Sequence, residues 1–321
     1  MMATVLQTDF AWPDTSIERG IIEAASHRLV CGPSTPLSAK EIEGLVARHD
    51  PQAIMTCWAQ VSRAAIELPG DLRIIQRLGV GLDNIVVPAA TARGAWVANV
   101  PDYCVHEVSD HAIALLLDWA RGTVRFDRDV KHGNWNPAAA QLRRVSDLTV
   151  GIIGYGPIGR STAAKASAFG CQVLINRASG GAVDIGMSCD LPTLLGQSDV
   201  VIIHAPLTQS TAHLLNRETI PAMKPGAYLI NVSRGPLVEN NALIAALESG
   251  HLSGAGLDVV EGEPCPPRAL IDRPDVIVTP HVAFSSEASL VELRRRSAEE
   301  VVRVLAGEPP RHPCNLPEKT A

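Results

Sequence analysis

Short apolar runs alternate with helical patterns along most of the chain. In the first hundred residues, apolar runs predict strands at 4–9, 27–32, 53–57, 72–79 and 96–100, with helices at 15–26 and 37–49 between them. A second series of predicted strands occupies 148–154, 171–176, 199–205, 226–233, 253–260 and 275–281. This alternation is typical of parallel sheets with helices on both faces. The pattern therefore predicts an α/β protein with two doubly wound parallel sheets.

The segments outside the two series are mainly helical. A long helical stretch is expected to open after Pro101 and to be broken only around Gly133. One further helix is expected from Glu287 to Leu305, followed by a Pro-rich tail. A chain of 321 residues suits two domains, and the last helix with its tail is too small for a third. We expect the tail to pack on a domain that is already formed.

Composition and charge narrow the class of partner. The formal net charge is -6 and no block is rich in Lys and Arg, which argues against a surface for nucleic acid or for anionic lipid. The most apolar helical stretch, near Leu115, is bounded by Asp110 and Asp118 and is too short to cross a bilayer. Seven cysteines without a C-x-x-C pair, and an N-terminus without a signal-peptide pattern, predict reduced thiols and a cytoplasmic location. The expected partner is a small molecule.

A glycine-rich turn is the strongest single motif. Gly154, Gly156 and Gly159 follow an apolar strand and open an Ala-rich helix, with Pro157 and Ile158 inside the turn. Glycines at this spacing let a pyrophosphate approach the backbone and rest on the N-terminal N–H groups of the helix. The alternative is an ordinary tight turn between strand and helix. The surrounding strand and helix favour dinucleotide binding.

The next predicted strand ends in residues that bear on the choice of cofactor. Many NAD-binding domains carry an acid there, which holds the ribose 2′-OH, but this chain has Asn176 and Arg177. A guanidinium can pair with a 2′-phosphate, and Ser179 offers a hydroxyl beside it. We therefore expect NADP(H) to be preferred. NAD(H) remains possible if Arg177 stacks over adenine or points into water.

Three polar residues follow strands of the second series, where open α/β sheets place their ligands. They are Arg234, Glu263 and His281. Taken singly, each is more typical of a solvated or structural side chain. Together they supply an anchor for a carboxylate, a carboxylate, and an imidazole that can transfer a proton near neutral pH. This set suits the reduction of a 2-keto acid. The remaining histidines show no spacing typical of a metal site, so no metal is expected.

Ordered stretches of the sequence resemble a known family, the D-isomer-specific 2-hydroxyacid dehydrogenases. They are "LGVGLDNI", "NVPDYCVHEVSDHAIALLLDWAR", "GIIGYGPIGR", "HAPLTQSTAHLLN", "MKPGAYLINVSRGPLVE", "GLDVVEGEP" and "TPHVA", in the family's order and spacing. The resemblance implies a flavodoxin-like substrate domain, 1–100 with 288–321, completed by the C-terminal tail. It also implies a Rossmann dinucleotide domain, 101–287, inserted between these two parts. The stretch after Pro101 is then expected to form a homodimer.

The resemblance also implies roles for individual residues. Arg234 fixes the substrate, His281 donates and accepts the proton, and Glu263 pairs with His281. Backbone N–H groups of Val80 and Gly81 bind the substrate carboxylate. The further residues implied for the cofactor are Asp258, at the nicotinamide carboxamide, and four that line the cleft, Ala205, Pro206, Thr211 and Val232.

The departures from the family pattern concern the substrate. Trp58 and Gln60 stand where phosphoglycerate-handling relatives, by resemblance, carry arginine. Trp58 is expected to cover a compact or apolar substrate, and a structural role for it remains open. Two other functions on this scaffold stay as alternatives: an NAD(H)-sensing corepressor like the C-terminal binding proteins, and a phosphonate- or phosphite-type dehydrogenase. A formate-type enzyme is expected to have glutamine at the position of Glu263.

Overall fold

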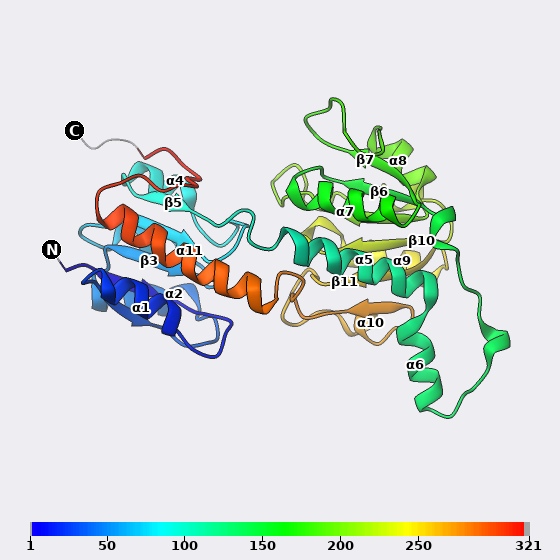
Figure 1. Cartoon of the computed structure of the whole chain (residues 1–321), viewed down its shortest axis with the longest axis horizontal. Helices are drawn as coiled ribbons and strands as arrows, with labels where there is room; N and C mark the ends of the chain where they lie inside the picture. The colour runs from blue at the N-terminus through cyan, green and yellow to red at the C-terminus, as the bar shows by residue number, and fades with distance from the viewer. Residues whose placement is uncertain (1, 318–321) are drawn as a thin grey trace. The chain divides into compact units, whose positions relative to one another are not determined.

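The structure is a computed structural model that describes residues 2–317, and the chain forms two compact units (Figure 1). The first unit runs to Tyr103 and resumes at Ser286, and the second is Cys104–Ser285. The boundaries expected from the sequence, 1–100 with 288–321 and 101–287, lie a few residues from these. Residues 318–321 of the expected range are outside the described part.

The first unit is built on a five-stranded parallel sheet with the order β2-β1-β3-β4-β5, the order of flavodoxin-like folds. Its strands are β1 (Thr4–Gln7), β2 (Arg28–Cys31), β3 (Ala53–Thr56), β4 (Ile74–Arg77) and β5 (Trp96–Ala98). Its helices are α1 (Ser16–Ala24), α2 (Ala39–His49), α3 (Arg63–Glu67), α4 (Val87–Ala92) and α11 (Glu287–Leu305). Because the strand order reverses at β1, right-handed crossovers put α1 on one face and α2, α3 and α4 on the other.

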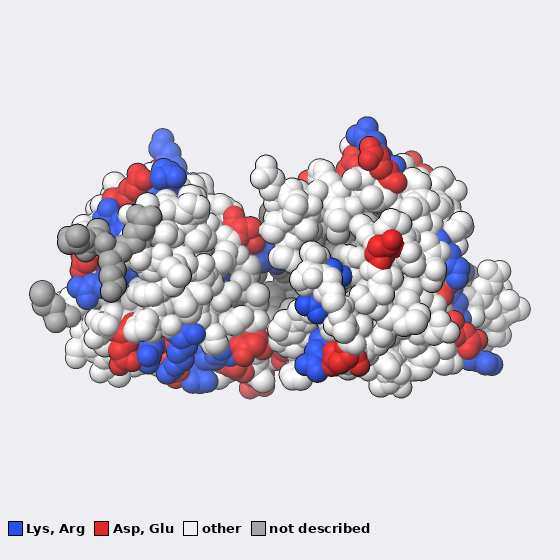
Figure 2. Space-filling view, turned by 90° about the horizontal axis from the view of Figure 1, so that it is seen from above, with Lys and Arg blue, Asp and Glu red and all other residues white. Residues whose placement is uncertain are grey.

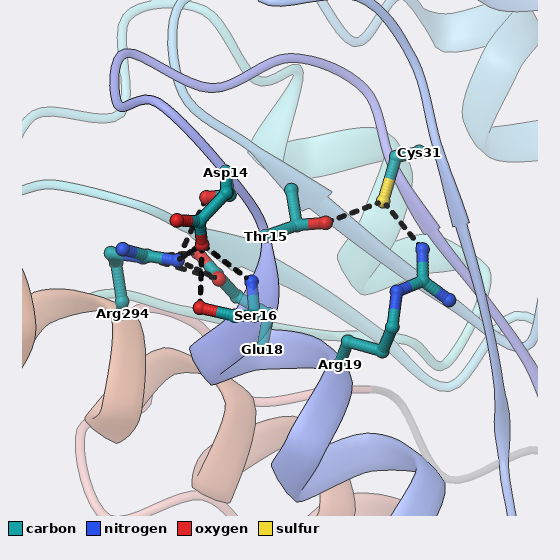
Figure 3. Close-up of polar contacts among 7 residues, drawn as sticks. All are labelled: Asp14, Thr15, Ser16, Glu18, Arg19, Cys31 and Arg294. Carbon is teal, nitrogen blue, oxygen red and sulfur yellow. Dashed lines mark hydrogen bonds and ion pairs between the residues drawn. The ribbon is translucent and has the colours of Figure 1, made fainter.

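The returning helix α11 has the range predicted from the sequence and packs against α1. A buried ion pair joins the two helices, since Arg294 Nη2 lies 2.8 Å from the fully buried Glu18 Oε2 (Figure 3). Asp14 also accepts from Arg294, at 3.2 Å, and hydrogen bonds from Ser16 lower the pKa of Asp14 to about 2. A buried guanidinium that keeps its carboxylate partner holds the returning helix in one register on α1.

The C-terminal tail lies along the edge strand β5. The Cys314 N–H donates to Val97 O at 2.7 Å, and the Val97 N–H donates to Asn315 Oδ1 at 2.7 Å. Asn315 Nδ2 also donates to Thr91 Oγ1 at 3.0 Å. The tail thus covers backbone groups that an open edge would expose. These bonds join Cys314 and Asn315 of the tail to the first unit.

The second unit is built on a seven-stranded parallel sheet with the order β12-β11-β10-β9-β6-β7-β8. Its strands are β6 (Thr149–Ile153), β7 (Gln172–Asn176), β8 (Met187–Ser188), β9 (Val200–Ile203), β10 (Ala227–Asn231), β11 (Leu252–Leu257) and β12 (Val276–Val278). Its helices are α5 (Val105–Arg121), α6 (Thr123–Lys131), α7 (Pro157–Ala168), α8 (Leu191–Gln197), α9 (Asn240–Glu248) and α10 (Arg268–Ile271). The strand order reverses between β6 and β9, and such a reversal opens a crevice at the carboxyl edge of the sheet.

The helical stretch after Pro101 differs from the prediction. It begins at Val105 and is divided at Gly122, so the expectation of a break only around Gly133 is wrong. Gly122 has a φ of 64°, a left-handed conformation that glycine adopts without steric cost. Asp118 serves both helices: its carbonyl accepts from the Gly122 N–H at the end of α5, and its Oδ1 accepts from the Val124 N–H, at 2.6 Å, at the start of α6.

Candidate functional site

The glycine-rich turn joins β6 to α7 and has the geometry of a pyrophosphate cradle. Gly154 has a φ of 100°, and a Cβ there would lie 2.6 Å from the backbone of His204. A Cβ on Gly159 would lie 2.1 Å from Gly154 O. A Cβ on Gly156, by contrast, would meet nothing within 4 Å, so the chain's own packing does not require a glycine there. The room at Gly156, beside the first N–H groups of α7, fits a bound pyrophosphate.

A hollow of about 600 Å³ lies beside this turn. It is lined by Tyr155, Gly156, Pro157, Arg160, Arg177, Ala182, Val183 and Asp184. Arg177 Nε donates to Ser179 Oγ at 3.0 Å. The Asp184 carboxylate accepts from Tyr155 OH at 2.7 Å and from Arg160 Nε at 2.8 Å, and these hydrogen bonds lower its pKa. The hollow therefore holds two guanidinium groups and one carboxylate, of which Arg160 and Asp184 are paired with each other.

Asn176, the other residue expected at the end of β7, is held by the main chain. Its Nδ2 donates to Cys189 O at 3.1 Å, which ties the end of β7 to the segment that follows β8. Sequence reasoning did not identify Tyr155, Arg160 or Asp184. Tyr155 and Arg160 were visible as neighbours of the three glycines, whereas nothing in the local sequence marked Asp184.

The four residues implied for the cleft lie in the segments that follow β9 and β10. Ala205 and Val232 are buried, and Thr211 Oγ1 donates to Pro206 O at 2.7 Å. The Nε2 of the neighbouring His204 lies 2.9 Å from the hydroxyl of the buried Thr162. Burial lowers the pKa of His204 to about 3, so the imidazole is neutral at physiological pH.

The three candidate catalytic residues follow β10, β11 and β12 at the carboxyl edge of the sheet. His281 Nδ1 lies 2.9 Å from Glu263 Oε1, which is the pairing expected from the sequence. Arg234 comes three residues after β10 ends at Asn231, whose Nδ2 donates to the Arg234 carbonyl at 2.9 Å. Arg234 Nη1 donates to Ser233 O at 2.8 Å. These contacts orient the imidazole and the segment that carries the guanidinium.

Asp258 lies at the end of β11 and is almost completely buried. Its Oδ1 accepts from the Val282 N–H and its Oδ2 from the Ala283 N–H, each at 2.9 Å. The residue expected at the nicotinamide carboxamide thus also holds the segment that follows His281.

The candidate substrate-binding residues Val80, Gly81 and Trp58 belong to the first unit, in the loops after β4 and β3. Fully buried Asp9 accepts from the N–H groups of Cys57, Trp58 and Ala59 at 2.9, 2.7 and 3.2 Å. Asn84 Nδ2 donates to Ala59 O at 2.9 Å, and Asn99 Nδ2 donates to Val80 O at 2.7 Å.

Both loops are therefore held by polar side chains, of which Asp9 and Asn84 are buried and Asn99 is half-buried. Asp9 was not identified from the sequence, although its place at the end of the first predicted strand was a signal of the same kind that identified Arg234 and His281.

The described residues contain no group of three or more His, Cys, Asp or Glu side chains able to hold a metal ion. Within the same residues, every helix is too short or too polar to cross a membrane. On the face shown in Figure 2, acidic and basic side chains are interspersed, without a broad patch of one sign.

Residues 113–283 match the family model described as "D-isomer specific 2-hydroxyacid dehydrogenase, NAD binding domain". A D-3-phosphoglycerate dehydrogenase of Synechocystis is 36% identical over 99% of the chain, but the chain spans only 57% of that protein's length. A glyoxylate reductase of Pyrococcus furiosus is 37% identical over 80% of the chain and 79% of its own length.

A solved structure gives a similar result. The NADPH-dependent glyoxylate/hydroxypyruvate reductase of Sinorhizobium meliloti, in complex with NADP and malonate, superposes with a TM-score of 0.88. It is 27% identical, and the match covers 100% of both chains.

Proposed function

Because the chain belongs to the D-isomer-specific 2-hydroxyacid dehydrogenase family, we propose that it transfers a hydride between a nicotinamide cofactor and a small 2-keto or D-2-hydroxy acid. The observation that carries this proposal is the His281–Glu263 pair, at 2.9 Å, on the same edge of the sheet as the glycine-rich turn. A proton donor and a dinucleotide cradle at one edge are what reduction of a carbonyl requires.

The chain's own residues supply binding and proton transfer. Arg234 binds the substrate carboxylate with its planar guanidinium. In the first unit, the backbone N–H groups of Val80 and Gly81 are the proposed substrate-binding groups. With Nδ1 held by Glu263, His281 gives a proton from Nε2 to the carbonyl oxygen during reduction and takes it back during oxidation. A nicotinamide bound beside the glycine-rich turn would supply a hydride to the carbonyl carbon in reduction and would take it from the carbinol carbon in oxidation. Trp58, whose main-chain N–H is held by Asp9, is a further proposed substrate-binding residue of the first unit.

For the cofactor we propose a preference for NADP(H) over NAD(H). Arg177 lines the hollow next to the glycine-rich turn and is not ion-paired with Asp184, which Arg160 occupies. The structurally similar Sinorhizobium reductase is an NADPH-dependent enzyme. Ala205, Pro206, Thr211 and Val232 would line the cleft, and Asp258 would face the carboxamide.

We also propose a cytoplasmic homodimer in which a second copy covers α6 and the segment after it. None of the residues of α6 is buried, and Val124, Val130 and Trp135 are 52%, 46% and 82% exposed. Apolar side chains this exposed along one projecting segment are typical of an interface (Figure 1). Sedimentation equilibrium on Trp135→Glu is expected to show a weakened dimer, and a parent that sediments as a monomer would contradict this part of the proposal.

Steady-state kinetics test the proposed reaction directly. The scan uses glyoxylate, hydroxypyruvate, pyruvate and bulkier 2-keto acids with NADPH and NADH, and formate and phosphite with the oxidised cofactors. His281→Gln is expected to lower kcat about 100-fold or more, since general acid catalysis contributes roughly 10²- to 10⁴-fold.

His213→Gln is the matched control. His213 also pairs with a carboxylate, Glu261, at 2.8 Å, and also has a positive φ, of 50°. Its loss is expected to leave kcat within about twofold of the parent. Equal losses in both variants, or turnover of formate or phosphite alone, would contradict the proposed function.

A further inference from the structure

His281 has a backbone conformation that needs support. Its φ is 53°, in the left-handed region that residues with a Cβ rarely adopt. Such a conformation persists only where surrounding contacts hold it, and it is common at functional sites. The orientation of the imidazole toward Glu263 therefore depends on the groups that hold this turn.

Asp258 provides that support from three directions. Its carbonyl accepts from the His281 N–H at 2.8 Å, and its carboxylate accepts from the Val282 and Ala283 N–H groups, each at 2.9 Å. The Asp258 side chain is 1% exposed, so water competes little for these bonds. The left-handed turn is thus bonded to one buried residue on the neighbouring strand.

Asp258 is held in turn by two side chains that the proposed mechanism does not use. Thr279 Oγ1 donates to Asp258 Oδ1 at 2.6 Å, and His111 Nε2 lies 3.0 Å from the same hydroxyl. A hydroxyl has one proton to donate, and here the carboxylate receives it. His111 Nε2 must therefore donate to the Thr279 oxygen, which fixes the direction of every hydrogen bond in the chain from His111 to Asp258.

The hydrogen-bonded series His111–Thr279–Asp258 connects a helix to the segment that carries His281. His111 lies on α5, whereas Thr279 follows β12 directly, two residues before His281. A charge-assisted bond as short as that from Thr279 to Asp258 is among the stronger hydrogen bonds in proteins. Loss of the Thr279 hydroxyl would leave His111 without this acceptor and Asp258 free to rotate away from the Val282 and Ala283 N–H groups.

We propose that His111 and Thr279 are positioning residues for His281. Through Asp258 they hold residues 281–283 in the left-handed turn that directs the imidazole to Glu263 and to the substrate. Their catalytic consequence rests on the proposed function, whereas the hold on the backbone does not. The role needs only an N–H group at Nε2 of His111.

The test compares Thr279→Val with Thr279→Ser, because only serine keeps the hydroxyl. Two measurements are made: kcat and KM in the reduction of the best 2-keto acid with NADPH, and amide hydrogen exchange at Val282 and Ala283. Thr279→Val is expected to lower kcat about tenfold or more, with KM for NADPH within about twofold, and to speed exchange at both amides. Thr279→Ser is expected to restore both measurements.

Thr162→Val is the matched control for stability. It removes a buried hydroxyl that also contacts a histidine, since Thr162 Oγ1 lies 2.9 Å from His204 Nε2. Thr162 has no hydrogen bond to residues 281–283. It is expected to leave exchange at Val282 and Ala283 unchanged. If Thr279→Val does not fold, His111→Leu and His111→Gln are compared in place of the two Thr279 variants. His111→Gln is expected to keep kcat and amide exchange near the parent values, because glutamine still offers an N–H.

The two measurements separate the two proposals. Exchange at Val282 and Ala283 that is unchanged in Thr279→Val would overturn the positioning role, whatever the activity. A kcat within twofold of the parent would overturn it as well. A parent that reduces no 2-keto acid would contradict the proposed function, and the exchange measurement would still decide whether His111 and Thr279 hold the turn.

Discussion

Arg177 offers the sharpest test of cofactor choice. Its Nε is committed to Ser179 Oγ at 3.0 Å, which leaves its two Nη nitrogens for a 2′-phosphate. Asp184 does not neutralise it, because that carboxylate accepts from Tyr155 and Arg160. We therefore expect Arg177→Ala to weaken the binding of NADPH but not that of NADH. A charge-assisted hydrogen bond contributes about 1.5 to 3 kcal/mol, which corresponds to about a 10- to 150-fold loss of kcat/KM for NADPH.

The assay measures kcat/KM for NADPH and NADH at one low salt concentration. NADH is expected to change by less than about twofold in Arg177→Ala, and Arg177→Asp is expected to reverse the preference, since a carboxylate accepts from the ribose and repels the phosphate. In the parent, higher ionic strength should weaken the binding of NADPH more than that of NADH. Salt screens the partly exposed contact between Arg177 and the 2′-phosphate.

Arg160→Lys is the matched control, because Arg160 lines the same hollow and lysine keeps a cation beside Asp184. We expect it to affect the two cofactors alike. Equal losses for both cofactors in Arg177→Ala, or a parent that already favours NADH, would refute the argument and leave Arg177 as a residue that only borders the adenine.

Three further predictions concern single side chains. Arg234→Lys is expected to lower kcat/KM about 10- to 150-fold, because the charge remains but the two-pronged grip is lost; kinetics within twofold of the parent would exclude that role. The pKa of His204 is lowered to about 3 in the folded chain, from about 6.5 in the unfolded chain. The free energy of unfolding is therefore highest above pH 6.5. It falls as pH drops toward 3, by up to about 1.4 kcal/mol per pH unit. Urea titrations of His204→Asn should show a weaker decline over that range than the parent, and parallel declines would count against it. Glu18→Ala leaves buried Arg294 without its main partner and is expected to lower the free energy of unfolding by about 3 to 5 kcal/mol, measured by urea denaturation; a loss below about 1 kcal/mol would show that Asp14 alone suffices.

The sequence by itself determined the two parallel sheets and the positions of their strands except β8 (Met187–Ser188), a two-residue edge strand with no apolar run to mark it. Buried strands such as β9 (Val200–Ile203) are continuous apolar runs, and helices such as α11 show their period and their caps locally. It also predicted which residues follow strands at the carboxyl edge, and so the meeting of Glu263 with His281. These features depend on neighbours within a few residues and on the rule that parallel strands end at one edge.

Only the tertiary structure decided which side chains hold the site. Asp258 lies 24 and 25 positions from the amides of Val282 and Ala283 that it binds, and His111 lies 168 positions from Thr279. The pairing of Asp184 with Arg160 and the hold of Asp9 on the loop after β3 are equally long-range. A polar side chain carries no local signal of its distant partner, because that partner is set by the packing of whole strands and helices. Burial of Asp9 and Asp258 then makes their hydrogen bonds costly to lose.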